Sequence, residues 1–227
     1  GYVSSEYRAF TQSPADTRQH HNNLSFAGQA EYFTDWDDGR QSFTITPFIR
    51  WDENDSERNH ADIRELTWLK AADDWELRVG LRKVFWGVTE SQHLVDIINQ
   101  TDLVEAADGE EKLGQPMINL ALIREWGTLD LFVLPGFRER TSPSEEGRLR
   151  FALPVDTEQA NYESSDKEEH IDYAARWTHT LSDWDVGLSY FNGTSRDPLF
   201  IPGLDNKGQP VLIPDYKLIK QWGLDLQ

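Results

Sequence analysis

Apolar and polar residues alternate along most of this 227-residue chain, and a period of two limits the folds that it can adopt. In the segment 75–82, one face reads Trp, Leu, Val and Leu, and the other reads Glu, Arg, Gly and Arg. Such alternation is typical of antiparallel strands with one apolar face. We therefore expect an all-β, antiparallel fold with about ten strands in this chain. The expected strands span residues 1–11, 24–36, 41–52, 60–70, 75–86, 117–126, 128–138, 170–181, 184–191 and 217–227.

The connections between these segments alternate in length. Odd-numbered connections are long, the longest being 87–116 and 139–169, whereas even-numbered ones are tight turns such as 37–40 and 182–183. Up-and-down barrels of outer membranes have this asymmetry, with short periplasmic turns and longer external loops, and a Greek-key sandwich has no reason for it. The strands are also long enough for a tilted crossing of the bilayer. The sequence favours an antiparallel up-and-down transmembrane β-barrel, with 1–227 as a single barrel domain or the N-terminal portion of a larger barrel.

Composition excludes several other classes of protein. The chain has 22 Lys and Arg against 40 Asp and Glu, a net charge of −18, so no nucleic-acid partner is expected, because a phosphate backbone needs a basic surface. No stretch approaches the roughly 18 apolar residues of a membrane-spanning helix. The absence of cysteine removes disulfides, thiolate zinc sites and cysteine nucleophiles. The six His show no spacing that would assemble a metal site, and we expect no metal or other cofactor.

Tryptophan residues accompany the tight turns. Trp36, Trp75, Trp126 and Trp184 each lie beside one of them. In a membrane barrel, such residues form an aromatic girdle at the interface between lipid and water. A Trp next to a turn can also plug the end of a soluble core, but four beside four turns favour the girdle.

If the apolar stripes face lipid, the alternate residues line a lumen. A lining of both charges is typical of a water-filled pore, although the solvated positions of a soluble sheet would have the same composition. Lys83 and Lys220 fall on the lipid-facing stripes and would have to lie near an interface or snorkel. The sequence contains no nucleophile elbow, P-loop or dinucleotide fingerprint, and we do not expect an enzyme. The expected pore-lining residues are Arg50, Glu65, Glu76, Arg78, Arg82, Asp130, Arg138, Asp172, Arg176 and Asp185.

The long connection 87–116 has a different pattern. Thr89 begins a Thr-x-x-Gln capping box, and Leu94, Ile97 and Ile98 recur at helical spacing, which predicts a short helix. Such a helix could fold into the lumen and present acidic side chains that narrow it. The alternative is a surface helix that caps the end of the barrel. The expected constriction residues are Glu90, Asp96, Asp102 and Glu105.

Three segments resemble the porin-like barrels of Gram-negative outer membranes: 64–68 (Arg-Glu-Leu-Thr-Trp), 75–80 (Trp-Glu-Leu-Arg-Val-Gly) and 85–87 (Phe-Trp-Gly). The run 94–103 resembles one group of large proteobacterial barrels of unsettled function, in which a Trp-Gly precedes an Asp-x-Ile-Asn segment. The likeness covers residues 60–140 well and the remainder only as a pattern. It implies a trimeric or monomeric channel whose third loop folds inward, and the larger size of these barrels implies further strands.

The sequence therefore predicts a channel for the passage of small solutes across the outer membrane of a bacterial cell. Its expected partners are outer-membrane lipid, lipopolysaccharide and the small solutes themselves, with an oligomer possible. The alternative is a soluble or surface-attached carbohydrate-binding β protein that uses exposed Trp as stacking platforms. A barrel-borne enzyme would need a Ser, His and acid cluster at one rim, and no such grouping stands out in the sequence.

Overall fold

The computed structural model describes residues 1–86 and 97–227, and within them the chain is all-β with three short 3₁₀ helices. The predicted class, all-β and antiparallel, is confirmed. No helix among the described residues is long and apolar enough to span a membrane. The helix expected from Thr89 onward, like the expected constriction residues Glu90 and Asp96, lies outside the described residues apart from its last few positions, and Ile97 to Asn99 are not helical.

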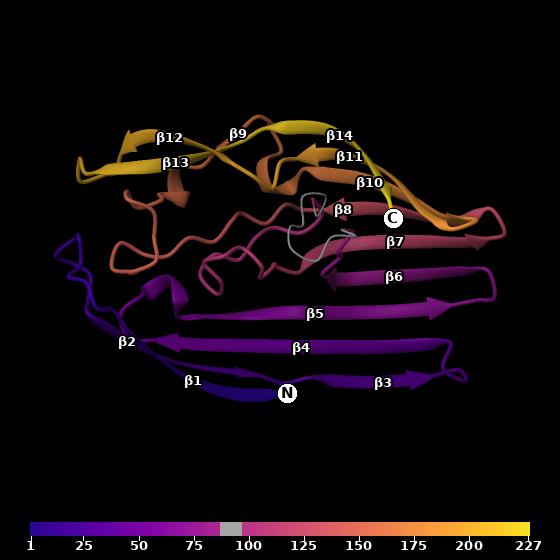
Figure 1. The fold of residues 1–227 in the computed structure, drawn as a ribbon, viewed down its shortest axis with the longest axis horizontal. Helices are drawn as coiled ribbons and strands as arrows, with labels where there is room; N and C mark the ends of the chain where they lie inside the picture. The colour runs from indigo at the N-terminus through magenta and orange to yellow at the C-terminus, as the bar shows by residue number, and fades with distance from the viewer. Residues whose placement is uncertain (87–96) are drawn as a thin grey trace.

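One large antiparallel sheet contains eleven strands in the order β1-β2-β4-β5-β6-β7-β8-β10-β11-β14, with β3 also paired to β4 (Figure 1). Strands that follow one another in this order also follow one another along the chain, apart from β3 and the strands of a smaller sheet. In the described residues, β1 and β14 each pair on one side only, so the sheet has two open edges. The strands of this sheet are β1 (Tyr2–Ala9), β2 (Asn22–Gln29), β3 (Tyr32–Trp36), β4 (Gln41–Asp52), β5 (His60–Ala71), β6 (Trp75–Arg82), β7 (Gln115–Arg124), β8 (Gly127–Pro135), β10 (Ile171–Leu181), β11 (Trp184–Thr194) and β14 (Leu218–Leu226).

The expected strand 24–36 is divided into β2 and β3, which pair with the two halves of β4. The interruption lies opposite Pro47, where the amide of Ala30 donates to the Pro47 carbonyl oxygen at 3.2 Å. Proline has no N–H and cannot donate to a sheet ladder. The eleven strands therefore fill ten rows, which agree with the ten segments expected from the sequence.

The tight turns all lie at one end of the sheet and the long connections at the other (Figure 1). The turn into β8 depends on Gly127, whose φ is +115°. A Cβ at this position would lie 2.4 Å from the carbonyl oxygen of Thr178, so only glycine fits there without a shift of the backbone.

A small second sheet forms within the long connections. It contains β9 (Asn161–Tyr162), β12 (Leu199–Leu204) and β13 (Pro210–Tyr216) in the order β12-β13-β9. Three 3₁₀ helices, η1 (Ser56–Arg58), η2 (Thr157–Gln159) and η3 (Lys167–Glu169), also belong to these connections. None of its three strands was expected from the sequence.

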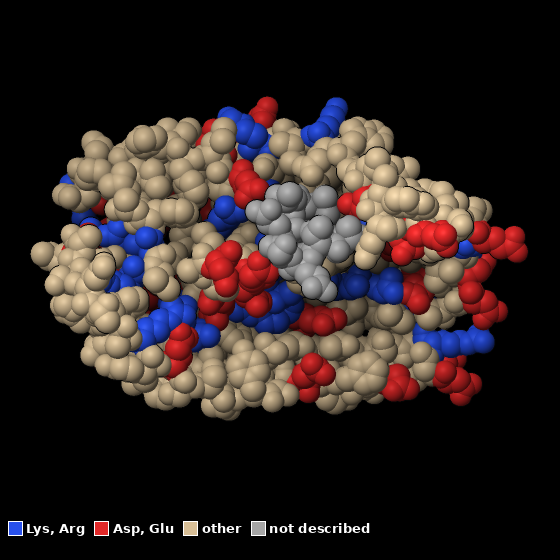
Figure 2. All heavy atoms as spheres, in the orientation of Figure 1, with Lys and Arg blue, Asp and Glu red and all other residues tan. Residues whose placement is uncertain are grey.

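The two faces of the large sheet have opposite character. We call the face that contacts the segment 97–114 the inner face. Figure 2 shows basic and acidic side chains mixed over the middle of the molecule and acidic ones at the end where the tight turns lie. A small apolar cluster, which includes Trp86, Met117, Phe132 and Phe191, is buried among these charges. Many large apolar side chains of the opposite, outer face are exposed, among them Ile49, Trp51, Leu131, Tyr173, Leu188, Trp222 and Leu224.

Candidate functional site

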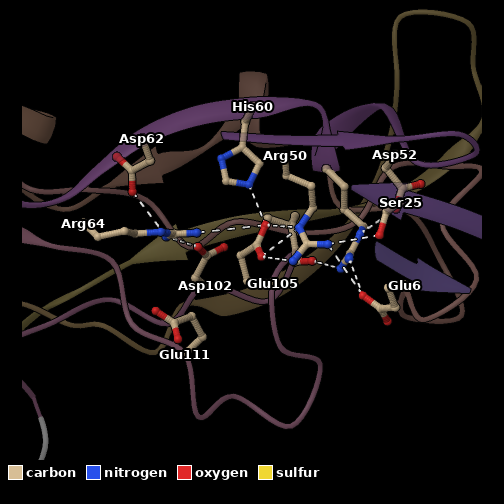
Figure 3. A network of polar contacts seen from close by, with 12 residues as sticks. Glu6, Ser25, Arg50, Asp52, His60, Asp62, Arg64, Asp102, Glu105 and Glu111 are labelled. Atoms are coloured by element: carbon tan, nitrogen blue, oxygen red, sulfur yellow. Dashed lines mark hydrogen bonds and ion pairs between the residues drawn. The ribbon is translucent and has the colours of Figure 1, made fainter. Parts of the chain in front are cut away.

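The candidate site is a network of charged side chains where the segment 97–114 contacts β4 and β5 (Figure 3). At its centre, Oε1 of Glu105 lies 2.9 Å from Nε of Arg50 and 2.7 Å from Nε2 of His60. Oε2 of Glu105 lies 2.8 Å from Nη2 of Arg50, and Nη2 of Arg64 lies 4.0 Å from Oε1. Three basic side chains therefore surround one carboxylate whose side chain is only 8% exposed.

Asp102 is the second acidic anchor of this segment. Its fully buried carboxylate accepts a hydrogen bond from Nη1 of Arg64 at 2.6 Å and another from Oγ1 of Thr141 at 2.7 Å. Arg64 also lies 3.3 Å from Asp62, whose other oxygen pairs with Arg138 at 3.0 Å. Alternating charges thus connect the segment to β5 and to the residues that follow β8.

A β-bulge directs Arg64 into this network. Between β4 and β5, Thr46 pairs with Glu65 and Pro47 pairs with Ile63, so Arg64 is the extra residue on the β5 side. A bulge leaves its extra residue unpaired and changes the direction of the side chains around it. Because Pro47 cannot donate to the ladder, a bulge at this place removes little hydrogen bonding.

The network continues toward β1 through Arg58 of η1. Nε of Arg58 lies 2.8 Å from the buried carboxylate of Asp52, and its Nη2 lies 3.4 Å from Glu6 of β1. Nη1 of Arg50 lies 3.6 Å from the same Glu6 oxygen. Arg58 also donates to the backbone carbonyl of Val104, which lies next to the central glutamate. Arg50 and Arg58 therefore connect the segment 97–114 to β1 and β4.

A separate anchor holds the two ends of the segment 97–114. The side-chain oxygen of Asn99 accepts from the backbone amide of Val84 at 2.7 Å. Its Nδ2 donates to the carbonyl oxygens of Arg82 at 2.7 Å and Leu113 at 2.9 Å. This buried amide does not depend on the charges around Glu105, so the segment has two independent attachments to the sheet.

The environment of Glu105 stabilises its ionised form. Burial is the largest single influence and by itself raises the pKa, because it disfavours the charged carboxylate. The hydrogen bonds from His60 and Arg50, together with their charges, outweigh burial and lower the pKa from 4.5 to about 2. Glu105 is therefore a fixed negative charge at neutral pH.

A cleft of about 910 Å³ opens next to the network, at the end of the sheet where the long connections lie. Its inner part is lined by His60, Asp62, Asp102 and Arg138. Its outer part is lined by residues of the connections, including 139–146, 154–158 and 205–207. None of the described residues that line it is Trp, Tyr or Phe, so this cleft offers no stacking platform for a sugar ring.

The expected pore-lining residues of β6 and β8 form a second cluster. Arg78 and Arg82 both approach the side-chain oxygen of Asn119 on β7, at 3.4 and 3.2 Å. Asn119 in turn donates to Asp130 of β8 at 3.0 Å, and Arg78 pairs with Glu76. These four expected residues are therefore held together on the inner face by Asn119, which the sequence analysis did not single out.

The expected residues of β10 belong to a third cluster. The fully buried Asp172 lies 2.6 Å from Arg196 and 2.8 Å from Nδ1 of His170. Burial is the dominant influence on Arg196 and lowers its pKa, against the opposing effect of Asp172. Further along β10, Arg176 lies 2.6 Å from Asp225 of β14. Because β11 lies between β10 and β14 in the sheet, this ion pair crosses one strand.

The remaining expected residues lie apart from these clusters. Glu65 faces Thr46 across the β4–β5 ladder, and Asp185 lies beside a tight turn, where it accepts from Oγ1 of Thr180 at 2.6 Å. Lys83 follows the end of β6 and pairs with Glu111, so the expectation that it lies on a lipid-facing stripe is wrong. β6 ends at Arg82, so the alternation does not extend to Lys83, whose side chain contacts Glu111.

The sequence did not indicate seven members of the network: Glu6, Asp52, Arg58, His60, Asp62, Arg64 and Thr141. His60, Asp62 and Arg64 lie in the expected strand 60–70, but their inward direction depends on a bulge that a strict period of two does not contain. The available signal was Pro47 within an expected strand, because proline inside a sheet is found at edges and bulges.

The charged side chains of the network can act on a ligand through their charges and hydrogen bonds. Among the described residues, no group of three or more His, Asp and Glu is placed to hold a metal ion. Comparison with protein-family models, with curated proteins and with solved structures finds no match for this chain.

Proposed function

We propose that the chain forms all or part of a transmembrane β-barrel in a bacterial outer membrane and acts there as a channel for small solutes. The observation that carries this proposal is the inverted polarity of the large sheet. A water-soluble sheet buries its apolar face, whereas a membrane barrel turns that face to lipid and encloses its polar one.

The exposed fractions support this proposal. On the outer face, Leu188 is 48%, Tyr173 is 50% and Trp222 is 79% exposed. On the inner face, Asp172 is 0% and Arg176 is 8% exposed. Contiguous exposed apolar surface is rare in soluble monomers and marks a surface that contacts lipid or a partner. Here it extends from β1 to β14, which suits the continuous band of a barrel wall.

The aromatic residues at the turn end suit the same membrane placement. Trp36 is 42%, Trp126 is 49% and Trp184 is 60% exposed, and each lies at a tight turn. Exposed Trp at one level is what an interfacial girdle requires. The tight turns would then face the periplasm, and the cleft would face the exterior.

Solutes would enter through the cleft and pass the segment 97–114, where the proposed constriction includes Asp102 and Glu105. Charged groups on opposite sides of this passage would determine which solutes cross it. We propose a passive route of this kind and no enzymatic reaction, with lipid and lipopolysaccharide in contact with the outer face.

Closure of the barrel requires a partner for each open edge. β1 runs toward the long connections and β14 runs away from them, so the edges are antiparallel to each other. They could pair directly or through an even number of further strands, in a monomer or in each subunit of a trimer, because antiparallel strands alternate in direction.

The test is expression with a signal peptide, followed by cell fractionation, electrophoresis with and without boiling, and reconstitution into planar bilayers. The proposal predicts recovery in the outer membrane, heat-modifiable migration and stepwise conductance. Recovery as a monodisperse protein that needs no detergent would refute it. Heat-modifiable migration without conductance would support the proposed barrel and refute the proposed channel function.

A further inference from the structure

The three basic groups around Glu105 make up a built carboxylate site. We call Arg50, His60 and Arg64 the cradle. The fork of Arg50 contacts both oxygens of the Glu105 carboxylate, with Nε 2.9 Å from each of them. His60 approaches from β5 at 2.7 Å. A planar guanidinium that holds two oxygens is the geometry with which proteins recognise carboxylates.

We propose that the cradle is a binding site for the carboxylate group of anionic solutes, and that Glu105 occupies it as an internal competitor. The inference rests on the proposed channel function, for which it names the class of solute. A solute carboxylate would take the place of the Glu105 side chain between Arg50 and His60, with no covalent step.

The cradle is accessible from the cleft. His60 lines the cleft, and its side chain is 23% exposed, whereas Glu105 behind it is 8% exposed. A solute in the cleft therefore contacts His60 first. Arg138 also lines the inner cleft, where it pairs with Asp62 at 3.0 Å.

Glu105 can leave the cradle while its segment stays attached to the sheet. Asp102 remains bound to Arg64 and Thr141, and Asn99 holds the ends of the segment. Only the side chain of Glu105 needs to move. Without it, the one carboxylate within 4.0 Å of Arg50 among the described residues is Glu6, at 3.6 Å, and Nη1 keeps its hydrogen bond to Ser25 at 3.0 Å. The cradle would then carry an excess of positive charge.

Tethering makes Glu105 a strong competitor. A group attached to its own site acts at an effective concentration of about a millimolar or more. A free carboxylate must exceed this concentration or make additional contacts in the cleft. Removal of Glu105 should therefore raise the affinity for a small carboxylate by about tenfold or more.

The experiment is chemical rescue of Glu105→Ala in the detergent-folded full chain. The melting temperature is measured against sodium acetate, with sodium chloride and acetamide as controls for ionic strength and shape. Mass action predicts that acetate at ten times its Kd raises the melting temperature of the variant by about 3–6 °C. The wild type should not respond beyond the chloride control.

The matched control is Arg50→Gln combined with Glu105→Ala, which removes the fork of the cradle and should abolish the rescue. Equal effects of acetate and chloride on Glu105→Ala, or equal rescue of the double variant, would overturn the inference. If Glu105→Ala does not fold, Glu105→Ser leaves the same space and is judged by the same criteria. Because rescue requires no conductance, its failure is distinguishable from failure of the proposed channel.

Discussion

Nη1 of Arg64 lies 2.6 Å from Oδ2 of Asp102, and the two residues are 38 positions apart in the chain. The partners are not equivalent. Arg64 has a second carboxylate, Asp62, at 3.3 Å, whereas Asp102 is fully buried and Arg64 is its one basic partner within 4.0 Å among the described residues. Loss of the arginine therefore leaves the buried Asp102 carboxylate with the hydroxyl of Thr141 but no basic partner among the described residues, whereas loss of the aspartate leaves Arg64 with Asp62.

This asymmetry predicts unequal costs for two substitutions. Arg64→Met should lower the free energy of unfolding by about 3–5 kcal/mol, because the Asp102 carboxylate stays buried without a basic partner. Asp102→Asn should cost about 1–3 kcal/mol, because Arg64 keeps Asp62. Urea unfolding of the detergent-folded protein measures both, and a larger cost for Asp102→Asn would contradict this assignment.

The stability contributed by Glu105 should depend on pH. Its pKa is lowered from 4.5 to about 2, so its contribution is fully present above pH 4.5 and is lost as the pH falls through about 2. The shift corresponds to about 3 kcal/mol, of which about 2 kcal/mol should be lost by pH 3. Melting curves of wild type and Glu105→Gln should differ at pH 7 and converge toward pH 3. A constant difference between them over this range would disprove the linkage.

Arg82 is predicted to influence ion selectivity. Among the described residues, no carboxylate lies within 4.0 Å of its guanidinium, which donates to the side chains of Asn119 and Met117. Arg82→Glu should raise the ratio of cation to anion permeability by about twofold or more, measured as a shift in reversal potential in a bilayer. Arg40→Glu, at a tight turn with 64% side-chain exposure, is the matched charge control. Equal shifts in the two variants would reject an inner-face position for Arg82.

Gly127 should tolerate no side chain. Its φ of +115° and the 2.4 Å approach to the Thr178 carbonyl oxygen predict that Gly127→Ala lowers the free energy of unfolding by more than about 1 kcal/mol. Gly208→Ala is the control, since φ is +75° there but no atom lies within 4 Å of the added Cβ. Its cost should be the smaller of the two in urea unfolding, and equal costs would show that contact with Thr178 does not matter.

The strands of the large sheet could be predicted because a period of two is a local property of the sequence. The positions of the tight turns followed from the same segments. The small sheet could not be predicted, since β9 has two residues, pairs in parallel, and lies far along the chain from β13. Proline at positions 202, 210 and 214 also hides the alternation of its longer strands.

The inward direction of the charged residues could be predicted from the sequence wherever a strand is regular, as for Arg78, Asp130 and Asp172. The partners of these residues could not be predicted, because they depend on which connections fold back over the sheet. Asp102 and Glu105 were expected to act at a constriction, yet nothing local in the sequence indicates that Arg64 and Arg50 would hold them.

The environment of the two faces of the large sheet in a lipid bilayer tests the proposed barrel directly. The chain has no cysteine, so single spin-labelled cysteines can be placed cleanly at the outward Leu77 and Leu131 and at the adjacent inward Arg78 and Asp130. A barrel wall with lipid on its apolar face predicts that oxygen reaches labels at the two leucine positions and that a water-soluble nickel chelate reaches those at the two charged positions. Equal access of the nickel chelate to all four positions would contradict a sheet that turns its apolar face to lipid.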